Sequence, residues 1–212
     1  MKPVNVIITK VVDETPTIRT FFFDTSFELI PGRFVMVWIR GVDEIPMALS
    51  YENAITVQKV GPATSALFEL EECDSFGIRG PYGTGFEIKN GSIMLIAGGV
   101  GAAPLAPLAE KISSNGAKIT TLLGARTGDE LLFRERFESV GELKVATDDG
   151  SEGEHGYVTE LLEAQENLGI CGACCVDGLR VCRDGPVFSG DVLKKTEFGV
   201  FRRNECGERV RV

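Results

Sequence analysis

The chain has 212 residues, enough for one large domain or two small ones. Hydrophobic residues make up 43% of it and charged residues 25%, a composition that excludes a disordered or low-complexity protein. The net charge of −9 argues against nucleic acid as a partner, because phosphate binding needs clustered Lys and Arg. The chain has neither an apolar run long enough for a membrane span nor a secretion signal at its start. We therefore expect a cytoplasmic protein that does not bind membranes.

Residues 1–88 have the pattern of a small β domain. Short runs rich in β-branched and aromatic residues alternate with turn formers such as Pro31-Gly32 and Gly41. The predicted strands cover residues 4–8, 21–23, 34–39 and 54–60. Because no convincing helix separates them, we predict an antiparallel β-barrel.

Residues 89–165 have the pattern of an α/β domain. Residues 92–97 form a continuous apolar run, which is typical of a strand buried on both faces. Apolar residues then recur at helical spacing within residues 102–113. Two further apolar strands and a short helix follow, at residues 118–123, 143–146 and 157–165. This order predicts a parallel, Rossmann-like sheet. Residues 166–212 are rich in Cys and Gly and too short for a core of their own, so we predict a metal-stapled tail.

A glycine-rich turn lies between the first predicted strand and helix of the α/β domain. It contains Gly98, Gly99, Gly101 and, in the first helical turn, Pro104. Glycines at this place let backbone N–H groups approach a pyrophosphate at the positive end of a helix. The usual third glycine is replaced by Pro104, so a tight turn without a ligand is the alternative.

Two other loops are candidates for ligand binding. Gly80, Pro81, Tyr82 and Gly83 form a loop at the join of the two domains, which suits a flat ring or a phosphate but equally an interdomain linker. Asp148-Asp149 follows a predicted strand and should lie at the carboxyl edge of the sheet, where ligands collect, or in a simple hydrophilic turn. His155 is the only histidine, and we interpret it as a solvated loop residue, so no catalytic residue is assigned.

Four of the six cysteines fall within twelve residues, at Cys171, Cys174, Cys175 and Cys182. A reduced cytoplasmic protein has little use for disulfides, so the cluster indicates metal binding or redox chemistry. Thiolates spaced C-x2-C-x7-C suit iron–sulfur or zinc. A second C-x2-C or paired histidines would favour zinc, and the sequence contains neither. Four unligated cysteines are the remaining alternative.

In order and spacing, several motifs together resemble the ferredoxin–NADP reductase superfamily and, within it, the electron-transfer subunits of dihydroorotate dehydrogenase B. The resemblance covers nearly the whole chain. The motifs that carry it are Pro31 to Val37, Ile45-Pro46-Met47-Ala48, Thr56-Val57-Gln58, Val60 to Thr64, Gly80 to Phe86, Gly98 to Pro104, Gly124-Ala125-Arg126, Thr147 to Ser151 and Cys182 to Phe188.

This resemblance implies an oxidoreductase subunit of pyrimidine biosynthesis with FAD on the barrel and NAD on the α/β domain. It implies a [2Fe–2S] cluster held by Cys171, Cys174 and Cys182. The implied FAD-binding residues are Ile45, Pro46, Met47, Ala48, Thr56, Val57, Gln58, Ala63, Thr64, Gly80, Pro81, Tyr82 and Gly83. The implied nucleotide-binding residues are Gly98, Gly99, Gly101, Pro104, Asp148 and Asp149.

The resemblance further implies a partner, an FMN-containing catalytic subunit, in a heterotetramer with two copies of each chain. The partner would oxidise dihydroorotate, and electrons would pass through the cluster and FAD to NAD⁺. Two other functions stay open. In the first, the chain is the reductase subunit of a sulfhydrogenase or of an NADH-dependent ferredoxin:NADP oxidoreductase, to which it is also similar. In the second, its cysteines hold structural zinc in a non-catalytic module.

The sequence departs from the family pattern at three places. Ile45 and Ala48 stand where the flavin motif has arginine and serine, so two side-chain contacts to FAD are lost. Glu166 stands at the position of the first cluster cysteine, and we predict Cys175 as the fourth ligand because thiolate suits iron–sulfur better than carboxylate does. A C-G-P-x-x-M strand expected between Leu162 and Asn167 has no counterpart.

Overall fold

The computed structural model describes residues 2–86, 88, 91–163, 175–176, 179–180, 201–203 and 209–211. The chain divides into two compact units, Met1–Val158 and Thr159–Val212. Among the described residues, none of the helices has the length and apolar character that crossing a membrane requires.

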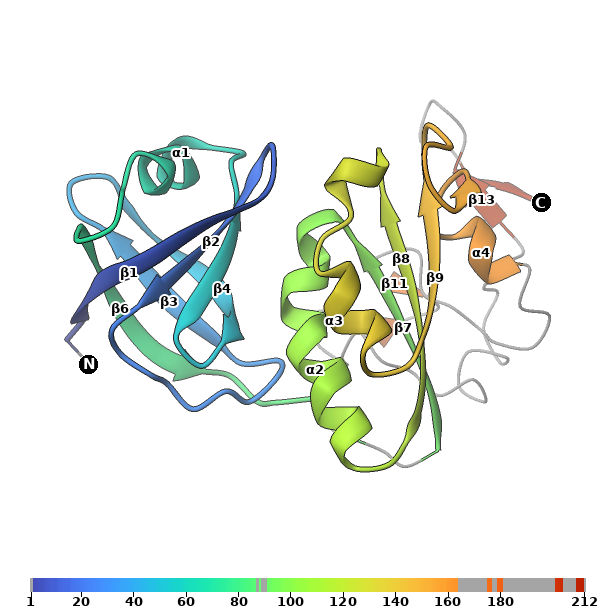
Figure 1. Ribbon diagram of the computed structural model, residues 1–212, viewed down its shortest axis with the longest axis horizontal. Helices are drawn as coiled ribbons and strands as arrows, with labels where there is room; N and C mark the ends of the chain where they lie inside the picture. Colours follow the sequence, from blue (N-terminus) through green and yellow to red (C-terminus); the bar gives the residue numbers. More distant parts are fainter. Residues whose placement is uncertain are drawn as a thin grey trace. The chain divides into compact units, whose positions relative to one another are not determined.

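Six antiparallel strands at the start of the first unit form a closed barrel, as the sequence predicts (Figure 1). Around the barrel the order is β1-β2-β5-β4-β3-β6. The strands are β1 (Val4–Thr15), β2 (Ile18–Phe23), β3 (Phe34–Ile39), β4 (Asp43–Tyr51), β5 (Ala54–Gln58) and β6 (Ser75–Tyr82). The short helix α1 (Pro62–Phe68) connects β5 to β6.

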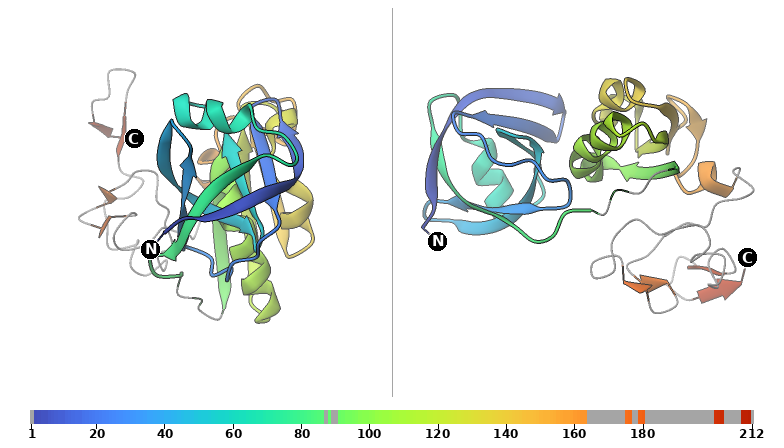
Figure 2. Two further views of the ribbon diagram at one scale, coloured as in Figure 1. Left: turned by 90° about the vertical axis from the view of Figure 1, so that its left-hand side faces the viewer. Right: turned by 90° about the horizontal axis from the view of Figure 1, so that it is seen from below.

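Alternation of inward and outward side chains, clearest in β3, contributes to the barrel core. In β3, Val35 and Val37 are fully buried, while Phe34 and Trp38 point outward and are exposed. Each fully buried large side chain of this kind contributes about 1.5–3 kcal/mol to stability. Helix α1 closes one end of the barrel, because its residues Ala63 and Leu67 belong to the same core (Figure 2).

A four-stranded parallel sheet follows the barrel within the first unit. Its order is β10-β9-β8-β7. The elements are β7 (Ser92–Gly98), α2 (Ala102–Ser114), β8 (Lys118–Ala125), α3 (Arg134–Glu138), β9 (Glu142–Thr147) and β10 (Glu154–His155). The Rossmann-like parallel sheet is therefore confirmed. His155 lies in β10 rather than in a loop, and it is exposed.

Strand β7 differs from the prediction of a strand buried on both faces. It is an edge strand of the described sheet, and Met94 and Ile96 are only half-buried. Leu95 and Ala97 are buried in the core that also contains residues of α2 and α3. An apolar run indicates that both faces of a strand favour burial. The position of the strand in the sheet depends instead on which other strands pair with it.

The barrel and the sheet share this second core. Ile18 of β2 is buried in the cluster that contains Ala97 and Leu108, and Tyr51 of β4 packs against it. Three hydroxyls lie buried on the neighbouring strands: Thr56 Oγ1 donates to Ser50 Oγ at 2.7 Å and lies 2.9 Å from Thr20 Oγ1. The barrel and sheet of the first unit are thus joined by apolar packing, while the three hydroxyls satisfy one another within the barrel wall.

Five α-helices and β-strands of the first unit were not predicted from the sequence: α1, β4, β6, α3 and β10. Strand β6 runs through Tyr82, so most of the predicted loop at Gly80 to Gly83 is strand. In the second unit, the helix expected at residues 157–165 is α4 (Glu160–Glu163). The described tail residues form two hairpins, β11 (Cys175–Val176) with β12 (Leu179–Arg180) and β13 (Phe201–Arg203) with β14 (Arg209–Arg211).

Candidate cofactor sites

The outer face of the barrel carries an aromatic surface made of two rings that are tilted by 43° to each other. Phe34 of β3 pairs with Ala48 of β4 on one side and with Tyr82 of β6 on the other. The rings of Phe34 and Tyr82 lie 5.9 Å apart, and Phe34 is 37% exposed. Ala48, on the other side of Phe34, adds little bulk there, so a flat ring system can lie against this surface. The sequence predicted Ala48 and Tyr82 as FAD-binding residues but not Phe34. Only the strand register places Phe34 between them.

Two of the predicted site residues, Gly80 and Gly83, border this surface. Gly80 and Gly83 have φ values of +126° and +83°, which side-chain-bearing residues rarely adopt. A Cβ on Gly83 would meet the Phe34 ring at 3.5 Å. The glycines therefore let the backbone turn closely past the aromatic surface. Pro81 lies between Gly80 and Tyr82 in β6.

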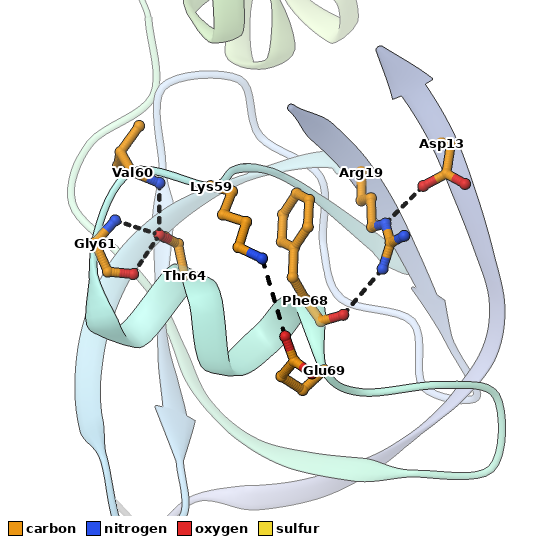
Figure 3. Close-up of polar contacts among 8 residues, drawn as sticks. All are labelled: Asp13, Arg19, Lys59, Val60, Gly61, Thr64, Phe68 and Glu69. Carbon is orange, nitrogen blue, oxygen red and sulfur yellow. Dashed lines mark hydrogen bonds and ion pairs between the residues drawn. The ribbon is translucent and has the colours of Figure 1, made fainter. Parts of the chain in front are cut away.

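Thr64 shapes the turn that begins α1 (Figure 3). Its Oγ1 accepts hydrogen bonds from the backbone N–H groups of Val60 and Gly61, each at 2.9 Å, and donates to the Gly61 carbonyl at 3.0 Å. The hydroxyl is fully used within the turn. The turn offers a ligand its backbone instead, because the first N–H groups of a helix, here those of Ala63 and Thr64, have no intrahelical partner.

A cavity of about 330 Å³ opens between this turn and the start of β4. Its lining consists of Val42, Asp43, Ile45, Val60, Gly61, Pro62, Ala63 and Thr64. No Lys or Arg is among them. Nearby cations are engaged elsewhere: Arg19 donates to Asp13 at 2.6 Å and to the Phe68 carbonyl at 2.9 Å (Figure 3). A phosphate group here would depend on backbone donors alone, consistent with Ile45 at the position of the family's arginine.

The remaining predicted FAD-binding residues differ in which of their groups are available to a ligand. Pro46 points outward beside Met36, whereas Ile45 and Met47 pack against the barrel core. Val57 is buried in that core, and the Thr56 hydroxyl is used by Ser50 and Thr20. Their side chains are therefore structural, and only backbone at Thr56 and Val57 is left for a ligand. Gln58 is half-buried at the end of β5.

The glycine turn lies where the sequence predicted, between β7 and α2. A Cβ on Gly98, Gly99 or Gly101 would meet no atom within 4 Å, so open space adjoins the backbone. Gly99 has a φ of +49°. Pro104 lies in the first turn of α2, where a missing N–H is no loss. This geometry fits a nucleotide phosphate at the start of a 13-residue helix.

The loops after β8 and β9 are bonded into one surface at the carboxyl edge of the sheet. Asp149 Oδ1 accepts from the backbone N–H and from Oγ of Ser151, at 2.9 and 2.6 Å. Ser151 Oγ in turn accepts from the Gly128 N–H at 2.8 Å. These donors lower the pKa of Asp149, the Ser151 hydroxyl contributing most. Asp149 thus organises the edge, while Asp148 is exposed there.

Arg126 and Glu130 complete this edge. Arg126 Nε and Nη2 donate to the two carboxylate oxygens of Glu130 at 2.8 and 2.5 Å. The bidentate bond raises the pKa of Arg126, and Asp148 adds a smaller effect in the same direction. Arg126 ends the motif Gly124-Ala125-Arg126 of the family resemblance, whereas Glu130 was not predicted. Both follow the second strand of the βαβ unit, which is a signal for the ribose of a dinucleotide.

Most of the cysteine cluster lies outside the described residues. Cys171, Cys174 and Cys182 are among the undescribed ones, and Cys175 lies in β11, paired with Arg180 across the hairpin. Among the described residues no three metal-ligating side chains gather elsewhere. The predicted ligand set therefore rests on its donor chemistry, four thiols within twelve residues.

A closed barrel with an outward aromatic surface, followed by a parallel sheet with a glycine turn, defines a protein with the fold of the ferredoxin–NADP reductases. A solved structure of an NADH-dependent reduced ferredoxin–NADP oxidoreductase matches with a TM-score of 0.72 and 29% identity, over 90% of this chain and 91% of the other. Residues 167–194, which contain the cysteine cluster, match the family model described as the iron–sulfur cluster binding domain of dihydroorotate dehydrogenase B.

Two curated relatives extend the match to the whole chain. Each is named probable dihydroorotate dehydrogenase B (NAD(+)), electron transfer subunit. The protein of Methanocella arvoryzae is 47% identical over 100% of both chains, and that of Methanocaldococcus jannaschii is 41% identical over 99% of this chain and 98% of the other. The chain belongs to the family of dihydroorotate dehydrogenase B electron transfer subunits. The first alignment runs over 258 positions, 46 more than the 212 residues here, so that relative contains segments that this chain lacks.

Membership of this family makes the chain an oxidoreductase subunit with FAD, NAD and a [2Fe–2S] cluster as cofactors. The described residues fit the two nucleotides: the barrel provides an aromatic surface and backbone donors, and the sheet edge provides glycines beside open space. The iron–sulfur match also decides against zinc for the cysteine segment. As a subunit, the chain works with a catalytic partner.

Proposed function

We propose that this chain connects an FMN-containing dihydroorotate dehydrogenase subunit to NAD⁺, in a cytoplasmic heterotetramer with two copies of each chain. The names of the curated relatives support the reaction, and reduced cysteines suit the cytoplasm. We further propose three functional segments, residues 1–88 for FAD, 89–165 for NAD and 166–212 for the cluster.

The observation that carries the proposal is the glycine turn Gly98–Gly101, which leaves open space at the carboxyl edge of a sheet that shares a core with a flavin-type barrel. Gly98, Gly99 and Gly101 would hold the nucleotide phosphates, with Pro104 fixing the first turn of α2. At the same edge, Asp149 holds the neighbouring loop in place and Asp148 faces solvent.

On the barrel, Phe34, Ala48 and Tyr82 would support the flat ring, and backbone at Gly80, Pro81 and Gly83 would border it. The backbone of Ala63 and Thr64 would meet the phosphates, next to Ile45, Pro46 and Met47 on β4 and Thr56, Val57 and Gln58 on β5. A bound flavin exchanges hydride with a nicotinamide and single electrons with an iron–sulfur centre, which is the chemistry this role needs.

The test is flavin content and nicotinamide reactivity of the full chain purified without oxygen. Heating should release FAD, at partial occupancy because Ile45 and Ala48 provide no polar contact. NADH should bleach the flavin absorbance band. Release of FMN, or bleaching by dithionite but not by NADH, would contradict the proposal.

A second function is favoured by one observation, the 29% identity to an NADH-dependent ferredoxin–NADP oxidoreductase over 90% of the chain. The chain would then pass electrons to a different partner. Co-expression with the FMN-containing subunit separates the two: our proposal expects a stable complex that reduces NAD⁺ with dihydroorotate. Absence of complex formation, with intact NADH-to-flavin reactivity, would favour the second function.

A further inference from the structure

The pair Arg126–Glu130 lies where a dinucleotide presents the ribose of its adenosine. Arg126 directly follows β8, the strand that comes after the glycine turn and α2 in the βαβ unit. In such units an acidic residue after the second strand accepts a hydrogen bond from the ribose 2′-hydroxyl of NAD, whereas an arginine accommodates the 2′-phosphate of NADP. This chain has one residue of each kind at the same edge.

The geometry decides which of the two residues is available. Two of the three donor nitrogens of Arg126, Nε and Nη2, donate to Glu130 at 2.8 and 2.5 Å, so this edge of the guanidinium is occupied by a carboxylate. The Arg126 side chain is 66% exposed and that of Glu130 is 20% exposed. The arginine is therefore within reach of a ligand, but its charge is already compensated.

The surroundings add negative charge. Asp148 acts on Arg126 through its charge. Glu152 lies beside Gly128 in the adjoining loops, where it pairs with Arg134. The Ser151–Gly128 bond holds the two loops together, so the loop that carries Asp148 keeps its place beside the arginine. A 2′-phosphate with two negative charges would be repelled here, while a neutral hydroxyl would not.

We propose that Glu130 determines the choice of NAD over NADP in this chain, by occupying Arg126 and by presenting its carboxylate to the ribose. Arg126 is then a masked phosphate ligand, which Glu130→Gln exposes. This rests on the proposed nucleotide site at the carboxyl edge of the sheet, and it names residues that determine specificity there.

The experiment measures binding and reduction in the full chain with FAD bound. The variants are Glu130→Gln, Arg126→Ala and the double variant. A matched control is Glu138→Gln, which removes a carboxylate from a second Arg–Glu pair at the same spacing, Arg134–Glu138. The binding probes are AMP and adenosine 2′,5′-bisphosphate by calorimetry, and the rate probes are NADH and NADPH in anaerobic flavin bleaching.

In Glu130→Gln we expect the preference for the bisphosphate over AMP, and for NADPH over NADH, to rise about tenfold or more. The double variant should lose this gain, because Arg126 provides it, and Glu138→Gln should resemble the unmodified chain. If AMP binds normally but the preference in Glu130→Gln is unchanged, the role of Glu130 is refuted. If AMP binds to none of the proteins, the nucleotide site at this edge, and with it the proposed function, is wrong.

Discussion

Arg136 of α3 joins the sheet to the barrel, and its removal should destabilise the first unit. Its Nε and Nη2 donate to Glu110 at 2.8 and 3.1 Å, and Nη2 also donates to the Ser50 carbonyl of the barrel at 3.1 Å. The guanidinium lies 4.1 Å from the Tyr51 ring centroid and 4.7 Å from that of Phe133. Burial, the largest effect, raises the pKa of Tyr51 at this junction.

The cost of Arg136→Ala follows from these contacts. The charged hydrogen bond to Ser50 contributes about 1.5 kcal/mol, and the two rings together about 1 kcal/mol. The ion pair adds about 0.5 kcal/mol, because Glu110 is 42% exposed and solvent screens it. The sum is about 3 kcal/mol, which corresponds to a decrease in Tm of about 6–12 °C for a chain of this length.

Urea unfolding measures this cost with two probes. The fluorescence of Trp38, the only tryptophan, reports on the barrel, and far-UV circular dichroism reports largely on α2. Because Arg136 joins the two regions, the two transitions should separate in Arg136→Ala more than in the unmodified chain. The control is Arg134→Ala on the same helix. The Arg134 side chain is 44% exposed, so its ion pairs should contribute less than about 1 kcal/mol to stability. A loss in Arg136→Ala no larger than in the control, with coincident transitions, would refute the reasoning.

Two further predictions concern the cofactor sites. Thr64→Val should lower the stability of the barrel by about 1–3 kcal/mol and reduce FAD content, because the N–H groups of Val60 and Gly61 lose their acceptor. Thr64→Ser should restore the stability, measured in thermal melts, and the FAD content, measured in flavin assays. Anaerobic reconstitution of single variants should give no iron–sulfur absorbance in Cys175→Ser, because a [2Fe–2S] cluster takes four ligands, whereas Glu166→Ala should keep it.

Each of these predictions has a clear contrary result. A Thr64→Val variant with unchanged melting and full FAD would show that the hydroxyl has no role in the turn. A full cluster in Cys175→Ser together with its loss in Glu166→Ala would make the carboxylate the fourth ligand. The parallel variants Cys171→Ser, Cys174→Ser and Cys182→Ser serve as positive controls for cluster loss.

The sequence by itself determined the order of barrel, parallel sheet and cysteine segment. The β-branched and aromatic run in 34–39 and the helical spacing in 102–113 are local patterns, and local patterns predict the kind of element that forms. The glycine turn at Gly98–Gly101 was predictable for the same reason, because a strand and a helix adjoin it directly along the chain.

Only the tertiary structure decided which side chains are free to act. Phe34 meets Ala48 and Tyr82 through strand register, and Arg136 reaches Ser50 across 86 positions of sequence. The Thr64 hydroxyl and the Arg126 guanidinium have the right chemistry for phosphate, yet neighbouring groups already use both. Whether a polar group is available depends on all of its hydrogen-bond partners. These lie within four residues for Thr64 and Arg126 and up to 86 positions away for Arg136, and no sequence pattern states which of them form.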